Sequence, residues 1–139
     1  CQRVFAPWGD MEEKMRAQNL PLWALESQEP VKDFDMIAFT IGYEMSYSNI
    51  VNMLRLSGVP IHSAQRQGLH NMVFAGGVCA FNPEPLAEFI DFFSTGEGED
   101  STVENTVQYK NCFPNFHTPM ARSGMFMSST SVPVGIFVA

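Results

Sequence analysis

The chain has 139 residues, a formal net charge of −7 and an apolar fraction of 45%. This length suits one domain with a single buried core, and the apolar fraction is ordinary for a globular protein. The acidic balance argues against nucleic-acid binding, and no apolar run approaches the roughly 20 residues that cross a bilayer. No basic segment followed by an apolar stretch begins the chain, so we expect a soluble protein without a signal peptide.

The first two predicted elements are a strand and a helix. Residues 3–7 favour the extended state, because valine and phenylalanine suit a pleated sheet. A helix is expected next, with Asp10 as its N-cap and with Glu13, three residues later, completing a capping box. Asn19 and Pro21 are expected to end this helix.

The clearest predicted strand spans residues 35–41. The continuous apolar run of residues 36–39 is typical of a strand covered on both faces, so we expect it at the centre of the sheet. A loop of residues 42–45 then leads to a helix expected over residues 46–57, which apolar side chains at helical spacing indicate. Gly58 is expected to end that helix.

The next stretch is expected to form two parallel strands joined by a crossover. An apolar strand over residues 72–75 is followed by a turn at Gly76 and Gly77. A short helix opened by Pro83 and Pro85 then leads to a second apolar strand over residues 90–93. Glycine at the end of a strand lets the chain turn sharply. The pattern therefore predicts a compact unit with both strands running in the same direction.

Alternating strands and helices joined by short loops predict an α/β fold. We expect a Rossmann-like or flavodoxin-like open parallel sheet, with helices on both faces and right-handed crossovers. Residues 1–100 are expected to form this domain, and residues 101–139 to form a divergent tail without an assigned fold. Within that tail, residues 132–138 are a candidate for an added strand.

Open parallel sheets bind ligands just outside the carboxyl ends of their strands, so we expect any binding site where three predicted strands end. Glycine lets the backbone approach a ligand, and hydroxyl or carboxylate side chains supply hydrogen bonds. The candidate binding residues are Thr40, Gly42, Tyr43, Glu44, Ser46, Gly76, Gly77, Cys79, Gly96, Glu97, Gly98 and Glu99. The pattern also fits a simpler interpretation, in which the glycines only turn the chain and the carboxylates face solvent.

Other side chains give no catalytic or metal site. The three histidines, His62, His70 and His117, fall in loop-like segments without ligand spacing, so we expect surface histidines. Cys79 has no basic neighbour in the sequence to activate it, and we expect a packed thiol. Three cysteines without a CxxC spacing argue against a disulfide framework and favour a reduced, cytoplasmic protein.

Eight motifs occur in order over about residues 3–100: FAPW, DMEEKM, ALES, DFD, YEMSY, AGG, FNPEPLAEFID and GEGE. With them, this part of the chain resembles the amino-terminal cobalamin-binding-like domain of B12-binding radical SAM proteins. The resemblance implies a Rossmann-like fold whose strand ends face a corrin or the neighbouring radical SAM barrel. That domain begins with another strand and helix, so the resemblance also implies an amino-terminally truncated fragment that starts at Cys1.

The barrel with its CxxxCxxC motif is absent from these residues, so the resemblance implies that the [4Fe-4S] cluster and S-adenosylmethionine belong to the parent protein. The DxHxxG motif that supplies a lower histidine ligand in B12-dependent mutases is also missing. The expected partner is the barrel of the parent protein, with no nucleic acid and no membrane. The missing strand is expected to leave a hydrophobic sheet edge near Val4 and Ile37 that promotes self-association.

The sequence leaves two hypotheses from the family and one from outside it. The first is a cobalamin-binding-like module, not catalytic on its own, with Glu44 and Glu97 as its best polar contacts. The second is a degenerate structural module that binds no cofactor and packs against the radical SAM barrel. A receiver-like or flavodoxin-like function fits less well, because the phosphoacceptor aspartate of the one and the phosphate loop of the other are missing.

Overall fold

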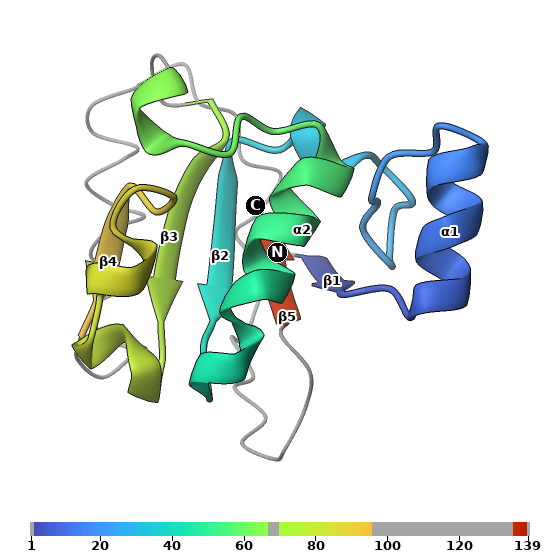
Figure 1. The fold of residues 1–139 in the computed structure, drawn as a ribbon. Helices are drawn as coiled ribbons and strands as arrows, with labels where there is room; N and C mark the ends of the chain where they lie inside the picture. The colour runs from blue at the N-terminus through green and yellow to red at the C-terminus, as the bar shows by residue number, and fades with distance from the viewer. Residues whose placement is uncertain (1, 67–69, 96–134, 139) are drawn as a thin grey trace.

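The computed structural model describes residues 2–66, 70–95 and 135–138, and its strands form one sheet (Figure 1). The order across this five-stranded sheet is β1-β5-β2-β3-β4. The strands are β1 (Gln2–Phe5), β2 (Met36–Thr40), β3 (Met72–Gly76), β4 (Phe92–Ser94) and β5 (Gly135–Val138). The expected α/β class and the central position of β2 are confirmed.

The directions of the strands divide the sheet into two parts. β2, β3 and β4 pair in parallel, as expected, whereas β5 runs antiparallel to both β1 and β2. β1 therefore points in the same direction as β2. The added strand expected within residues 132–138 is confirmed over Gly135–Val138, and it pairs with the backbone at Val4 and at Ile37.

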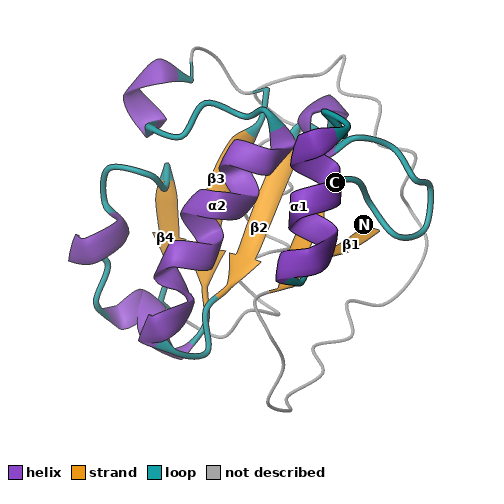
Figure 2. Cartoon of the chain, turned by 45° about the vertical axis from the view of Figure 1, so that its right-hand side comes forward, coloured by secondary structure: helices purple, strands orange, loops and turns teal. Residues whose placement is uncertain are grey.

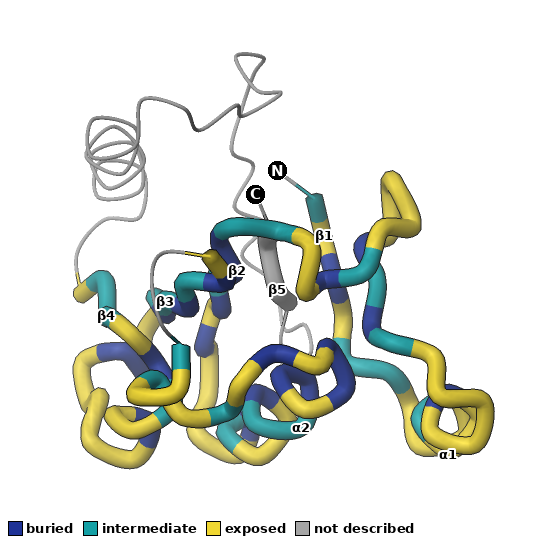
Figure 3. Tube along the Cα trace, turned by 90° about the horizontal axis from the view of Figure 1, so that it is seen from above, coloured by how far each residue is buried: buried dark blue, intermediate teal, exposed yellow. Residues whose placement is uncertain are grey.

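Two α-helices, α1 (Gly9–Ala17) and α2 (Tyr47–Ser57), lie on the same side of the sheet, as Figure 2 and Figure 3 show. Strands at the centre of this sheet bury their alternate side chains against the helices, because successive side chains point to opposite faces. Among the described residues, neither α-helix lies on the opposite face. Helical cover of that second face remains an expectation from the sequence.

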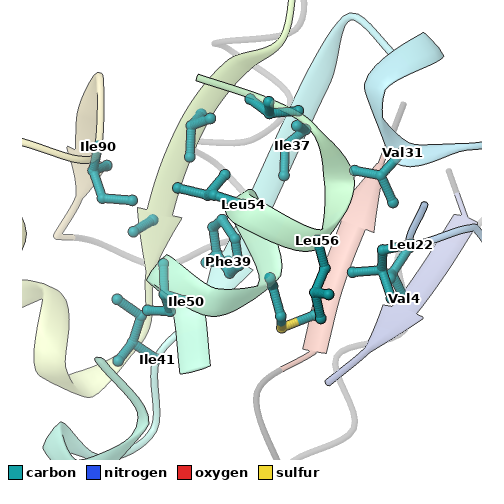
Figure 4. Packing of buried hydrophobic residues seen from close by; sticks show 14 of the residues in the cluster. Val4, Leu22, Val31, Ile37, Phe39, Ile41, Ile50, Leu54, Leu56 and Ile90 are labelled. Carbon is teal, nitrogen blue, oxygen red and sulfur yellow. The ribbon is translucent and has the colours of Figure 1, made fainter. Parts of the chain in front are cut away.

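Much of the core lies between α2 and the parallel strands β2 and β3. Ile50 and Leu54 of α2 are fully buried and lie over Ile37 and Phe39 of β2 (Figure 4). The apolar spacing predicted the helix because residues three to four apart share one face. Gly58 ends α2 in the left-handed conformation, with φ of 73°, as predicted.

The predicted capping box of α1 is wrong. The helix begins at Gly9, with Trp8 at the N-cap, and no side chain caps its first turn. The amide of Glu12 donates to the carbonyl of Trp8, so Asp10 lies inside the first turn and not before it. There its negative charge still complements the helix dipole. The predicted end is close, since the helix stops at Ala17.

The crossover between β3 and β4 contains two short 3-10 turns, Val78–Phe81 and Glu84–Leu86, where the sequence suggested one short helix. Proline has no amide hydrogen, and the two prolines in this segment limit how far a helix can extend. The crossover is held instead by the guanidinium of Arg66, which is almost fully buried. It donates to the Asp91 carboxylate and to the carbonyls of Pro60, Ile61 and Phe89.

Candidate functional site

The ends of β2 and β3 meet at one edge of the sheet, where both arrowheads point in Figure 1. Thr40 pairs with Gly76 at the last position of the two strands. Beyond it, the amide of Ile41 donates to the carbonyl of Gly76 at 2.8 Å, and the amide of Cys79 donates to the carbonyl of Ile41 at 3.1 Å. These bonds join two loops that are far apart in the sequence.

Gly77 is required by the contact between these loops. Its φ is 100°, and a Cβ atom built there would lie 2.7 Å from the carbonyl oxygen of Ile41. Gly42 differs, because nothing lies within 4 Å of the position its Cβ would take. Gly77 therefore serves the packing of the chain itself, whereas no neighbouring atom requires a glycine at position 42.

Two ionisable side chains beside this junction, Cys79 and Tyr47, have a raised pKa. Burial raises the pKa of the Cys79 thiol above its ordinary value, and the nearby Glu44 carboxylate raises it further. Burial likewise raises the pKa of the Tyr47 phenol, with added effects from Cys79 and Glu44. Cys79 is part of the buried core. At neutral pH the thiol stays protonated, which does not suit a nucleophile.

Among the described residues, two buried hydroxyl groups have no hydrogen-bond partner: Tyr47 Oη, at the start of α2, and Ser94 Oγ, at the end of β4. A buried polar atom without a partner costs free energy, so each such atom in a folded protein asks for an explanation. No pattern in the sequence selects either residue as a ligand contact. Tyr47 follows the apolar spacing of α2, and Ser94 follows two phenylalanines at the end of β4.

Large apolar side chains are exposed at the end of β1 and in the segments that follow β1, β2 and β3. We call this set the apolar rim; its members are Phe5, Trp8, Tyr43, Met45, Val78 and Phe81. The exposed fraction is 84% for Trp8 and 75% for Met45, so these side chains are almost entirely in solvent. Because the three strands run in the same direction, their loops leave from the same edge of the sheet.

The structure brings two of the three predicted clusters of site residues together. Thr40, Gly42, Tyr43, Glu44 and Ser46 follow β2, and they lie beside Gly76, Gly77 and Cys79, which follow β3. In the first cluster, Ser46 is buried and the other four are exposed. The third cluster, Gly96, Glu97, Gly98 and Glu99, lies outside the described residues.

Among the described residues, His62 and His70 each lie close to one carboxylate. Nδ1 of His62 lies 3.7 Å from Glu88, and Nδ1 of His70 lies 3.3 Å from Asp35. In the part of the chain that the structure describes, no three histidine, cysteine or acidic side chains are grouped so that they could hold a metal ion. None of the described helices has both the length and the apolar character needed to span a membrane.

Comparison with known proteins adds a family match. A family model described as "Radical SAM proteins, N-terminal" matches residues 1–134. A protein of Methanocaldococcus jannaschii that is described as uncharacterized is 36% identical over 92 residues, which are 65% of this chain and 19% of that relative. The chain thus matches about a fifth of the relative's length. No solved structure matches.

Proposed function

This chain belongs to the family formed by the N-terminal regions of radical SAM proteins, and we propose that it is a non-catalytic module that binds cobalamin at the carboxyl edge of its sheet. In this proposal the radical SAM barrel of the parent protein holds the [4Fe-4S] cluster and S-adenosylmethionine. The module contributes the surface against which the corrin lies, between its own strand ends and that barrel.

The observation that carries the proposal is the joined ends of β2 and β3, which border open space at Gly42 and carry exposed apolar side chains. A corrin is a broad, largely apolar ring with amide groups around its periphery. Ligand sites of this kind combine apolar walls with a few placed polar groups. Met45 and Phe81 offer the apolar contacts, and the carboxylate of Glu44 offers a polar one.

When bound, cobalamin supplies a cobalt centre that can carry a methyl or alkyl group. The described strand-end loops contain no histidine, so these residues would hold the corrin by its ring and periphery.

A second candidate function is the degenerate module, which binds no cofactor and packs against the radical SAM barrel. The observation in its favour is Gly77, whose lack of a side chain is fully accounted for by the contact with Ile41. A glycine kept for the chain's own packing needs no ligand to explain it. In that case the apolar rim contacts the surface of the radical SAM barrel and not a corrin.

Absorption spectroscopy separates the two candidates. The purified chain is titrated with hydroxocobalamin and then desalted, with circular dichroism as the check that it is folded. Retention of about one equivalent of corrin with a shifted visible band supports the cobalamin module. A folded chain that retains no corrin contradicts it and favours the degenerate module.

The variant Glu44→Gln locates the site, because it removes the charge of the exposed carboxylate that the proposal places against the corrin. We expect it to weaken corrin retention by roughly tenfold, the value of about one lost hydrogen bond. The matched control is Glu13→Gln, which removes an exposed carboxylate from α1. Equal retention by the two variants would place the corrin elsewhere.

A further inference from the structure

The sheet has a second apolar face, on the side away from α2. Successive side chains of a strand point to opposite faces, so the residues that alternate with the core positions of β2, β3 and β4 lie there. We call these residues the second face. The strand register places them in three rows across the sheet: Met36 beside Met72, then Ala38, Phe74 and Phe92, then Thr40, Gly76 and Ser94. None of them is charged, and the first two rows are entirely apolar.

The side chains of the second face form one surface that is partly withdrawn from water. The rings of Phe74 and Phe92 are stacked, with centroids 5.0 Å apart and planes that differ by 6°. Met36 is only 4% exposed, although it does not belong to the core cluster on the α2 side. Neither of the described α-helices lies on this side of the sheet (Figure 3). A contiguous apolar surface of this kind indicates a packing partner.

The chain leaves and re-enters the sheet at the same edge, beside the second face. β4 ends at Ser94, which pairs with Gly76, and β5 begins at Gly135, which pairs with Thr40. Neighbouring strands lie roughly 4.8 Å apart, so about five extended residues would join these two ends. The connection, residues 95–134, is far longer. It has to pass β3 and β2, and α2 already fills the other side of these strands.

The sequence of this connection suits a buried place against aromatic rings. Its charged side chains after Glu104 are Lys110 and Arg122 alone. Phenylalanine and methionine, which pack well against aromatic rings, recur in it: Phe113, Phe116, Met120, Met125, Phe126 and Met127. The family model matches residues 1–134, so the connection belongs to the matched region.

We infer that residues 101–134 pack on the second face of the sheet and complete a second apolar core there. A segment that is joined to the sheet at both ends reaches this face at a high effective concentration, whereas a second copy or a separate protein has to bind from solution. Residues 101–134 are then part of the domain and not a separate tail. The inference is independent of the cobalamin proposal, because it needs no ligand.

The first test is a double-mutant cycle in the full chain. One change is Phe74→Ala, and the other replaces residues 101–130 with a glycine–serine linker of the same length, which keeps β5 attached. Urea denaturation measures the unfolding equilibrium constant of each chain. We expect Phe74→Ala to raise this constant about tenfold more in the full chain than in the linker chain, because only the full chain loses packing against the segment. Equal factors in the two chains would overturn the inference.

Leu54→Ala is the matched control for this cycle. Leu54 is fully buried on the α2 side of the sheet, away from the second face. Its truncation should therefore raise the unfolding equilibrium constant by the same factor in both chains. Circular dichroism checks that the linker chain is folded.

Trypsin gives a second test, which does not require the linker chain to fold. Lys110 and Arg122 are the tryptic sites within residues 101–134. We expect slow cleavage at both in the full chain and cleavage about tenfold faster in Phe74→Ala, because proteolysis follows the population in which a segment is open. The control Phe81→Ala truncates a phenylalanine that is 72% exposed and should leave the rate unchanged. Equal rates in the three chains would contradict the packing of this segment.

Sedimentation velocity distinguishes the segment from a second copy of the chain as the occupant. We expect a monomer both for the full chain and for Phe74→Ala. A full chain that dimerises, and that becomes monomeric with Phe74→Ala, would mean that a second copy covers the face, and it would overturn the inference.

Discussion

The backbone conformation and the surroundings of Gly77 leave no room for a side chain. Its backbone has φ of 100° and ψ of −178°, a region that only glycine adopts at low cost, and a Cβ would meet the Ile41 carbonyl. We expect Gly77→Ala to lower the free energy of unfolding by roughly 2 kcal/mol or more. Urea denaturation measures this, with Gly42→Ala as the control that should change stability by less than about 0.5 kcal/mol. Equal losses of stability in the two variants would contradict the steric constraint at Gly77.

Cys79 should react slowly with thiol reagents at neutral pH. Burial, and then the Glu44 charge, keeps the pKa of the thiol above its ordinary value, so the reactive thiolate forms only at higher pH. The folded state gains from the neutral thiol below the ordinary pKa and loses that gain as the pH rises towards the raised value. A chain with Cys1→Ser and Cys112→Ser isolates this thiol, and its rate of alkylation by iodoacetamide is followed against pH.

Glu44→Gln tests the second cause of that shift. Without the carboxylate, the pKa of Cys79 should fall slightly, and alkylation at a given pH should become faster. The change should be small, because burial is the larger cause. A slower reaction than in the parent chain would contradict the assigned sign of the interaction.

At the scale of elements, hydrogen bonds from Arg66 join the β3–β4 crossover to the loop after α2. Its side chain is 2% exposed and bonds both oxygens of Asp91, which also accepts from the Val73 amide. Arg66→Met would leave the Asp91 carboxylate and three carbonyls without this donor, so we expect a loss of about 3–5 kcal/mol. Chemical denaturation provides the measurement. The control Arg3→Met breaks an ion pair with Glu26 in which the side chains are 60% and 41% exposed, and it should cost no more than about 1 kcal/mol.

The elements were predictable to different degrees. The apolar spacing and terminal glycine of α2 act within one turn, so the sequence located this helix to within one residue. The start of α1 was predicted less well. The sequence favoured Asp10 as the N-cap, but the carbonyl of Trp8 accepts the first helical hydrogen bond. Arg66 belonged to a segment without a sequence pattern, because its partners are contributed by distant parts of the chain.

At the scale of the molecule, β5 fills the position between β1 and β2 and so makes the sheet continuous. It pairs with β1 on one side and with β2 on the other. The far edge of β1 is partly covered as well, because the Leu25 amide donates to the Arg3 carbonyl and Glu26 accepts from the Arg3 amide. Self-association through the strands of Val4 and Ile37 therefore stays a proposal. It requires β5 to separate from β1 and β2, so that their backbone groups can pair with another chain.

Removal of residues 135–139 should bring about that self-association. The backbone groups of β1 and β2 that pair with β5 would lose their partners, and unpaired strand edges recruit other chains. Sedimentation velocity over a range of concentrations should then detect dimers or larger species, with the full chain as the reference. A truncated chain that stays monomeric at every concentration would contradict the proposal.

The sequence alone determined the α/β class, the central strand, α2 and the two strand ends that meet at the candidate site, because these depend on short-range patterns of apolar residues and glycine. Only the tertiary structure decided that Gly77 serves the contact with Ile41, that Tyr47 and Ser94 bury hydroxyls without partners among the described residues, and that β5 lies between β1 and β2. Each of these depends on atoms that are brought together from distant parts of the chain, where no local pattern records the contact.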